Sequence, residues 1–142
     1  MSGPTPKALA DALKWMSRKD RFATEIAEYL AARGYSSDDV SETLNYVQSK
    51  GLQSDRRTAE AWQRHFESKG FSPAWIAERL QALGCPMDLI GSGSDTGTQS
   101  LRQLAAEQLQ KGQSPAKAAR FLISRGHDPD EVALVVGELS EP

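Results

Sequence analysis

The chain has 142 residues, a formal net charge of −2 and a hydrophobic fraction of 39%. This length suits one ordinary domain or a short array of small ones, and an aromatic fraction of only 7% favours several small cores over one large globule. The slightly acidic balance excludes a global basic field that attracts nucleic acid, so any DNA contact must come from a local patch.

Nothing in the sequence predicts export or membrane insertion. The opening MSGPTPKALA lacks the apolar run of a signal peptide, and no stretch reaches the roughly 18 apolar residues of a membrane span. The single cysteine, Cys85, excludes an internal disulfide, and we interpret it as a small, half-buried apolar residue. We therefore expect a soluble, cytoplasmic protein with no membrane contact.

Every periodic segment predicts helix, and no segment alternates as a strand does. Glycines follow the helix-forming runs, where a left-handed residue ends a helix. Ser72-Pro73 and Ser114-Pro115 place a capping hydroxyl before a proline at the first helical position. The predicted helices span residues 6–17, 20–33, 37–50, 55–69, 73–83, 99–111, 115–125 and 129–139.

The sequence at the end of one predicted helix occurs three times in the chain. IAEYLAARGY, beginning at Ile26, returns as IAERLQALGC at Ile76 and more faintly as AARFLISRGH at Ala118. A helix precedes each copy, and a third helix follows the first and third copies, so the repeating unit is about 45 residues of three helices. Each unit buries only a thin core and needs stacking on its neighbours.

These patterns predict an all-α protein, an elongated and curved tandem array of three three-helix repeats at residues 1–53, 54–98 and 99–142. The third helix of the second repeat is shortened, because GSGSDTGTQS follows Ile90 and both glycine and serine disfavour helix. We predict a hinge over residues 91–98, with Gly91, Gly93 and Gly97 as its flexible points.

The sequence carries no recognisable catalytic or metal-binding pattern. His65 and His127 lie far apart, and no Cys-x-x-Cys, His-Glu-x-x-His or calcium-loop motif occurs. Acids such as Asp38 and Asp130 are interpreted as helix N-terminal residues that favour the helix dipole. We expect no catalytic residue, no metal and no cofactor, and hence a binding protein that is not an enzyme.

Local basic clusters are the candidate contacts for a polyanion or an acidic protein surface, although solvated helix faces balanced by nearby acids are the more common explanation of such clusters. A helix-turn-helix DNA-binding regulator at residues 20–33 and 37–50 is an alternative, but the acids of its second helix would repel phosphate. A generic helical-repeat interaction module is another. The candidate residues are Lys14, Arg18, Lys19, Arg21, Arg57, Arg64, Lys69, Arg120 and Arg125.

The three tryptophans allow a different hypothesis, a stacking platform for single-stranded nucleic acid. Trp62 shares a helix face with Ala59 and Phe66 and is better explained as core. Trp15 neighbours the basic cluster around Arg18, and Trp75 lies in the first turn of its helix, where it could seal a repeat interface.

Two stretches resemble the RecX family of bacterial regulators of the RecA recombinase. MSRKDRFATEIAEYLAARGYSSDDVSETLNYVQSKGLQSDRRTAEAW is similar to the first repeat and its junction, and GFSPAWIAERLQALG to the second repeat. The resemblance is clear over residues 8–90 and weak over 99–139. Thr58 stands where the family usually has Phe or Tyr, which is expected to thin that junction. The matching positions are Arg18, Arg21, Glu25, Ile26, Leu30, Gly34, Gly51, Leu52, Asp55, Ala59, Gly70, Ile76, Leu80 and Gly84.

The resemblance implies a monomer that binds along the groove of the RecA–DNA filament. It implies inhibition of ATP hydrolysis, strand exchange and co-protease activity, and hence a role in recombination and the SOS response. The acidic balance leaves at most a weak DNA contact through the local basic patches. Among the candidates, Arg18, Arg21, Arg57 and Arg64 are the first choice as contacts.

Overall fold

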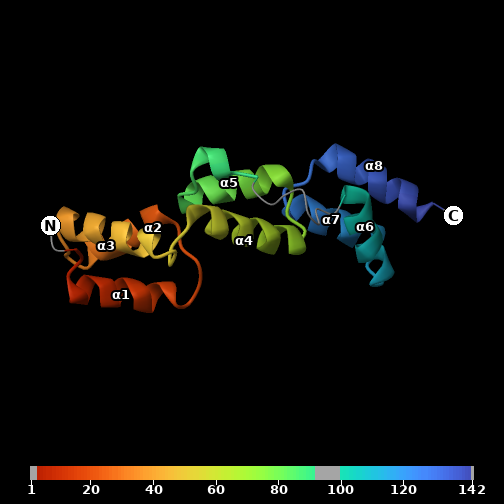
Figure 1. Ribbon diagram of the computed structural model, residues 1–142. Coiled ribbons are helices and arrows are strands. Elements are labelled where there is room, and N and C mark those ends of the chain that lie inside the picture. The colour runs from red at the N-terminus through yellow and green to blue at the C-terminus, as the bar shows by residue number, and fades with distance from the viewer. Residues whose placement is uncertain (1–2, 92–99, 142) are drawn as a thin grey trace. The chain divides into compact units, whose positions relative to one another are not determined.

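A computed structural model describes residues 3–91 and 100–141, which are helical with no strand (Figure 1). The all-α class and the three-helix repeats are confirmed, and the helix boundaries differ from the predicted ones by at most three residues. The shortened third helix of the second repeat is also confirmed as a single 3-10 turn. The elements are α1 (Pro6–Met16), α2 (Ala23–Ala32), α3 (Ser37–Ser49), α4 (Asp55–Ser68), α5 (Pro73–Leu83), η1 (Met87–Leu89), α6 (Leu101–Gln110), α7 (Pro115–Ser124) and α8 (Pro129–Ser140).

The described chain divides into two compact units, residues 3–62 with 80–91 and residues 63–79 with 100–141. The dividing points fall inside α4 and α5, so both helices contribute to both units. The repeat boundaries at 53/54 and 98/99 remain a prediction. Gly91 has a left-handed φ of 92° and ends the turn after η1, whereas Gly93 and Gly97 lie outside the described residues. The hinge therefore also remains a prediction.

The first unit is built on α1, α2 and α3, which lie side by side in Figure 1. Ala12, Ile26 and Leu30 are fully buried at its centre, and Val40 and Leu44 of α3 pack against them. Helices α1 and α3 begin at the predicted residues 6 and 37, where the Thr5 and Ser36 hydroxyls accept backbone N–H groups. The core therefore comes from the apolar faces that the sequence repeat marks.

Helix α2 begins three residues later than predicted because its first N–H groups are capped from elsewhere. The Phe22 N–H donates to the Glu25 carboxylate at 3.0 Å, and the Ala23 N–H donates to Oδ1 of Asp55 at 2.9 Å. Asp55 lies 32 residues away at the start of α4. Phe22 itself is fully buried, so the preceding residues form a linker and not a helical turn.

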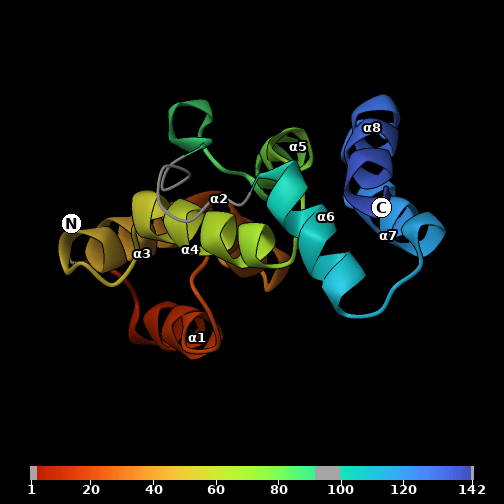
Figure 2. The same ribbon diagram turned by 90° about the vertical axis from the view of Figure 1, so that its right-hand side faces the viewer.

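The second unit has its own core between α6, α7 and α8, and Figure 2 shows α7 and α8 running side by side. Leu122 of α7 and Val132 of α8 are fully buried, and Leu104 and Ala105 of α6 complete the centre. Ser114 and Asp128 cap α7 and α8 as predicted. Among the described helices, none is long and apolar enough to cross a membrane.

The recurring glycine at the end of a second helix is a docking point for the start of another. In the first unit, the Thr24 hydroxyl near the start of α2 donates to the Gly84 carbonyl after α5 at 3.3 Å. In the second unit, the Ser72 hydroxyl before α5 donates to the Gly126 carbonyl after α7 at 2.9 Å. The orphan carbonyls of one helix end are thus satisfied by a neighbouring helix start.

Thr58 was expected to weaken the packing at the junction after the first repeat, but it forms hydrogen bonds there. Its side chain is buried, and its hydroxyl lies 3.1 Å from the Arg21 carbonyl, while Nε2 of Gln53 donates to the same carbonyl at 3.0 Å. Buried polar groups that are hydrogen-bonded in this way support a defined packing where an aromatic ring is absent.

Candidate partner-binding surface

A stack of two rings and two guanidinium groups organises the surface of the first unit. Trp15 of α1 and Tyr29 of α2 are parallel, with centroids 4.3 Å apart. The Arg21 guanidinium carbon lies 3.9 Å from the Trp15 centroid, and that of Arg33 lies 5.4 Å from the Tyr29 centroid. Because Tyr29 covers one face of Trp15, Arg21 must cover the other.

A hollow of about 370 Å³ lies beside this stack. Lys14 and Arg18 reach it from the end of α1, and both are exposed and form no ion pair within the described residues. Arg33 adds a third cation from the end of α2, and Asp11 is the one acid in the lining. The net positive lining suits a carboxylate or a phosphate, which arginine can bind through two parallel hydrogen bonds.

Asp11 is engaged within the protein by Tyr35 and Arg33 and leaves Lys14 and Arg18 available. The Tyr35 hydroxyl donates to its carboxylate, and Nε of Arg33 lies 3.4 Å from the same oxygen. The hydrogen bond from Tyr35 lowers the pKa of Asp11 below its ordinary 3.8, with Arg33 adding to the effect against a smaller contribution from burial. The same bond raises the pKa of Tyr35 above 10.0. Asp11 therefore links the middle of α1 to the residues that follow α2.

Arg21, one of the predicted contacts, lies against the rings. Its side chain is 14% exposed, its guanidinium is 3.8 Å from the Glu25 carboxylate, and its Nε has no hydrogen-bond partner in the described structure. This placement suits a residue that positions Trp15. Lys14 and Arg18 are the open cations of this surface, whereas Arg33 is exposed but paired with Asp11.

Two further candidates are also engaged within the first unit. The Arg57 guanidinium donates to the carbonyls of Gly51 and Leu52 at 3.2 and 3.0 Å, and its Nε lies 3.5 Å from Asp20. It therefore satisfies carbonyls at the end of α3. The Lys19 ammonium lies 4.7 Å from the Trp62 centroid, within range of a cation–π contact.

The remaining candidates belong to the second unit. Nε of Arg125 donates to the Lys69 carbonyl at 3.0 Å, and its guanidinium lies over Phe71 and Phe121 at 4.5 and 4.7 Å. Arg125 therefore ties the ends of α4 and α7. The side chains of Arg64, Lys69 and Arg120 are exposed. Lys14, Arg18 and Arg33 line the same hollow in the first unit, whereas Arg64, Lys69 and Arg120 belong to the second unit.

The stacking platform is not supported by the tryptophans. Both faces of Trp15 are covered, and Lys19 lies over Trp62. Trp75 stacks on Phe71 with centroids 3.8 Å apart and meets Phe66 edge-on. A Cβ added at Gly126 would lie 2.7 Å from Cβ of Trp75, so Trp75 packs against the end of α7, and its role in sealing a repeat interface stays a prediction. A base could not stack on Trp15 without displacing Arg21 or Tyr29.

Arg33 and Tyr29 are the functional candidates that sequence reasoning missed. The repeat contained a signal for both, because Arg33 and Tyr29 align with Arg125 and Phe121 in the third copy. Arg33 lies over Tyr29 as Arg125 lies over Phe121. Comparing charged positions across the copies, and not only apolar ones, would have identified the pair.

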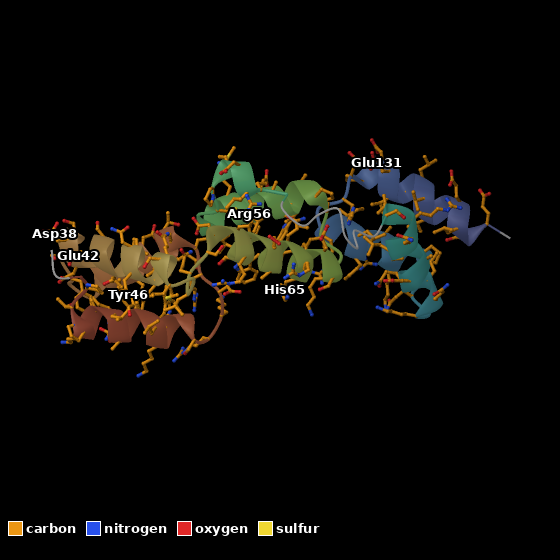
Figure 3. All side chains as sticks on the ribbon, viewed as in Figure 1. Asp38, Glu42, Tyr46, Arg56, His65 and Glu131 are labelled. Atoms are coloured by element: carbon orange, nitrogen blue, oxygen red, sulfur yellow. The ribbon has the colours of Figure 1, made fainter. Side chains whose placement is uncertain are left out.

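The acidic side of the first unit is on α3. Figure 3 shows Asp38, Glu42 and Tyr46 in a row along this helix, and Asp38 and Asp39 occupy its first turn. A recognition helix that enters a DNA groove would bring these carboxylates to the phosphates. This surface therefore does not favour a helix-turn-helix reader. Among residues 3–91 and 100–141, no three His, Cys, Asp or Glu side chains gather as a metal site.

Comparison with known proteins identifies relatives of the whole chain. Residues 8–46 match the family model described as RecX, first three-helix domain. The chain is 35% identical over 130 residues to the regulatory protein RecX of Chromohalobacter salexigens, covering 86% of each chain. It is 30% identical over 142 residues to the regulatory protein RecX of Legionella pneumophila strain Corby, covering 94% of this chain and 95% of the relative.

A solved structure shares the fold. The crystal structure of RecX from Lactobacillus salivarius superposes with a TM-score of 0.71 at 21% identity and covers 94% of each chain. The fold is that of an all-helical repeat protein, and the named relatives are regulatory proteins. With the relatives at 30–35% identity, the chain belongs to the RecX family, and the resemblance in the sequence is confirmed.

Proposed function

We propose that this protein is a non-enzymatic, cytoplasmic regulator that binds the RecA–DNA filament and inhibits RecA activities, namely ATP hydrolysis, strand exchange and co-protease function. Membership of a family of regulatory proteins supports the class. The observation that carries the contact is the hollow lined by Lys14, Arg18 and Arg33 beside the Trp15–Tyr29 stack.

Tyr29 and Asp11 keep Arg33 in place, which reduces the entropy lost on binding. Long basic side chains lose rotamer freedom when they order at an interface, at about 0.5–1.5 kcal/mol each. Arg33 is held by Tyr29 and Asp11 before any partner arrives. Lys14 and Arg18 are exposed, and supply long-range attraction to an acidic surface.

The proposed partner contact is with carboxylates of the recombinase and not primarily with DNA. Net charge −2 gives no long-range attraction to a polyphosphate, and the local cluster offers only three cations against one engaged acid. No face of Trp15 is open to a base. Any contact with DNA through the local patches is secondary.

The test is an ATPase assay of cognate RecA on single-stranded DNA with increasing amounts of this protein. Lys14→Glu with Arg18→Glu should weaken inhibition by at least tenfold, because two open cations become acids at the contact. The matched control is Lys50→Glu with Arg79→Glu, which makes the same charge change at exposed positions outside the hollow. Circular dichroism checks that both double variants keep their helicity.

The rival classes give different results. A sequence-specific DNA-binding regulator would shift duplex DNA without RecA, and a generic interaction module would leave RecA activity unchanged. Equal inhibition by the Lys14/Arg18 variant and the wild type would reject this surface while leaving the family assignment intact. Arg21 is unsuitable for the charge reversal because its side chain is packed on Trp15.

A further inference from the structure

One repeat junction of this chain is built from two short segments that can be described contact by contact. Residues 69–75, KGFSPAW, lie against the end of α7 in the second unit. The Ser72 N–H donates to the Arg125 carbonyl at 2.9 Å, and the Ser72 hydroxyl donates to the Gly126 carbonyl at 2.9 Å. In return, Nε of Arg125 donates to the Lys69 carbonyl at 3.0 Å.

Glycine is required at the centre of that junction. Gly126 has a φ of 90°, and a Cβ there would lie 2.7 Å from Cβ of Trp75 and 2.8 Å from Oγ of Ser72. The backbone of α7 is therefore approached closely by the segment that precedes α5. The junction therefore has two parts. A segment of sequence K-G-x-S-P-A, residues 69–74, donates hydrogen bonds, and the Arg-Gly pair at the end of α7, residues 125–126, accepts them.

Both halves occur a second time in the chain. Residues 111–117 read KGQSPAK, which repeats the Lys, Gly, Ser, Pro and Ala of the donor segment. Arg33-Gly34 at the end of α2 repeats Arg125-Gly126, with a φ of 93° at Gly34 and with Arg33 lying over Tyr29 as Arg125 lies over Phe121. We call residues 33–35 the acceptor end and residues 111–117 the donor end.

Neither copy has a seated partner within the described residues. A Cβ added at Gly34 or Gly112 would meet nothing within 4 Å. The acceptor end borders a hollow of about 440 Å³ lined by Lys7, Asp11, Arg33, Gly34 and Tyr35. The side chains of the donor end are exposed throughout.

We propose that the donor end of one copy binds the acceptor end of a second copy, so that molecules associate head to tail. Ser114 would donate to the carbonyls of Arg33 and Gly34, as Ser72 does to those of Arg125 and Gly126. Because the two surfaces differ, the contact is heterologous and leaves one end open after each addition. This inference goes beyond the proposed function and does not depend on the recombinase as partner.

This contact is weaker than the internal junction between residues 69–75 and 125–127, because three residues of that junction are replaced. Gln113 and Lys117 replace Phe71 and Trp75, which removes aromatic area from the donor end. Tyr35 replaces His127, whose Nε2 lies 2.8 Å from the Gly70 carbonyl, and the Tyr35 hydroxyl is already used by Asp11. Free molecules are therefore monomers in dilute solution. Copies aligned along a polymer reach effective concentrations in the millimolar range, where such a contact forms.

The first test uses the wild-type full chain alone. Amide NMR spectra recorded from micromolar to millimolar protein should show shifts that grow with concentration and cluster at residues 33–35 and 111–117. A spectrum that is independent of concentration up to the millimolar range, or shifts concentrated elsewhere, overturns the proposal.

The second test gives the donor end the two aromatic residues that the 69–75 segment carries. Gln113→Phe with Lys117→Trp should tighten association by about tenfold or more and give open-ended growth in sedimentation velocity. Adding Arg33→Ala to this variant should stop its self-association yet leave it able to bind one wild-type chain, which supplies the missing acceptor end.

Two outcomes of the second test contradict the head-to-tail contact. One is a restored variant that stays monomeric, and the other is association that persists unchanged with Arg33→Ala, which would mark non-specific aromatic adhesion. Both outcomes are measured as self-association alone, whereas the Lys14→Glu with Arg18→Glu assay measures inhibition of RecA, so the two proposals fail separately.

Discussion

Thr43 places a hydroxyl inside the first unit without a partner, and this predicts a stabilising substitution. The residue is fully buried, and its Oγ1 accepts and donates no hydrogen bond in the described structure. Burying an unsatisfied hydroxyl costs about 1–3 kcal/mol. Valine has nearly the same shape and a similar helix propensity. Thr43→Val should therefore raise the free energy of unfolding by about 1–2 kcal/mol.

Thr58 supplies the matched control because its hydroxyl is bonded. The same substitution there removes the link to the Arg21 carbonyl at 3.1 Å but leaves the Gln53 amide on that oxygen. Thr58→Val should therefore lower the free energy of unfolding by about 1 kcal/mol. Both residues lie in the first unit, so they report on the same part of the molecule.

Urea unfolding gives the free energy of unfolding of both variants and thermal melts give their midpoints, each followed by far-UV circular dichroism. For a unit of this size, 1 kcal/mol moves the thermal midpoint by about 4–8 °C, so the two variants should separate clearly in opposite directions. The reasoning is refuted if Thr43→Val destabilises as much as Thr58→Val does, because the Thr43 hydroxyl would then have a partner such as a buried water.

Three further substitutions test particular contacts. Gly34→Ala should lower the free energy of unfolding by about 1–2 kcal/mol because of the left-handed φ alone. Gly126→Ala should lower it by about 1–3 kcal/mol more, because the new Cβ would lie 2.7 Å from a neighbour. Thermal melts compare the two variants. Arg125→Lys should destabilise by about 1–3 kcal/mol, measured by urea titration, because lysine cannot both stack on two rings and donate from a fork. Asp11→Asn should remove part of the acid sensitivity of stability, measured by melts across acidic pH. The pKa of Asp11 is depressed below 3.8 in the folded state, so its contribution is present above that value and is lost as pH falls through the folded pKa.

Each of these expectations has a clear contrary result. Equal costs at the two glycines would mean that the junction relaxes around a methyl group. A neutral Arg125→Lys would show that charge alone is needed there. An unchanged pH profile for Asp11→Asn would mean that the bond from Tyr35 adds nothing to folding.

The fold was predictable because its signals are local. Helix starts at Ser36 and Ser114 depend on a hydroxyl three residues before the N–H that it caps. The predicted start of α2 was wrong because its cap, Asp55, comes from 32 residues away. No local pattern contains such a contact. The shortened third helix of the second repeat was predictable because Gly and Ser follow it immediately.

The candidate site was predictable only in part. Lys14 lies in the last turn of α1 and Arg18 follows it by four residues, just after the helix ends, so the sequence alone keeps them close. Arg33 joins them only through the packing of α2 on α1, which a charge pattern does not reveal. Cys85 was expected to be half-buried and is 6% exposed, and burial raises the pKa of its thiol to about 11. Its neighbours give it no activation.

Arginine was the residue type that sequence reasoning interpreted least well, and the structure shows why. A guanidinium has an apolar face and five donors, so it serves equally as a surface cation and as a clamp on helix-end carbonyls. Arg57 and Arg125 are clamps, and both reach carbonyls at the end of a helix that a glycine terminates. Lys14 and Arg18 have no such carbonyl and remain open. In a protein made of short helices, many helix ends need donors, so a basic residue near a terminating glycine should be tested first as a structural residue and only then as a contact.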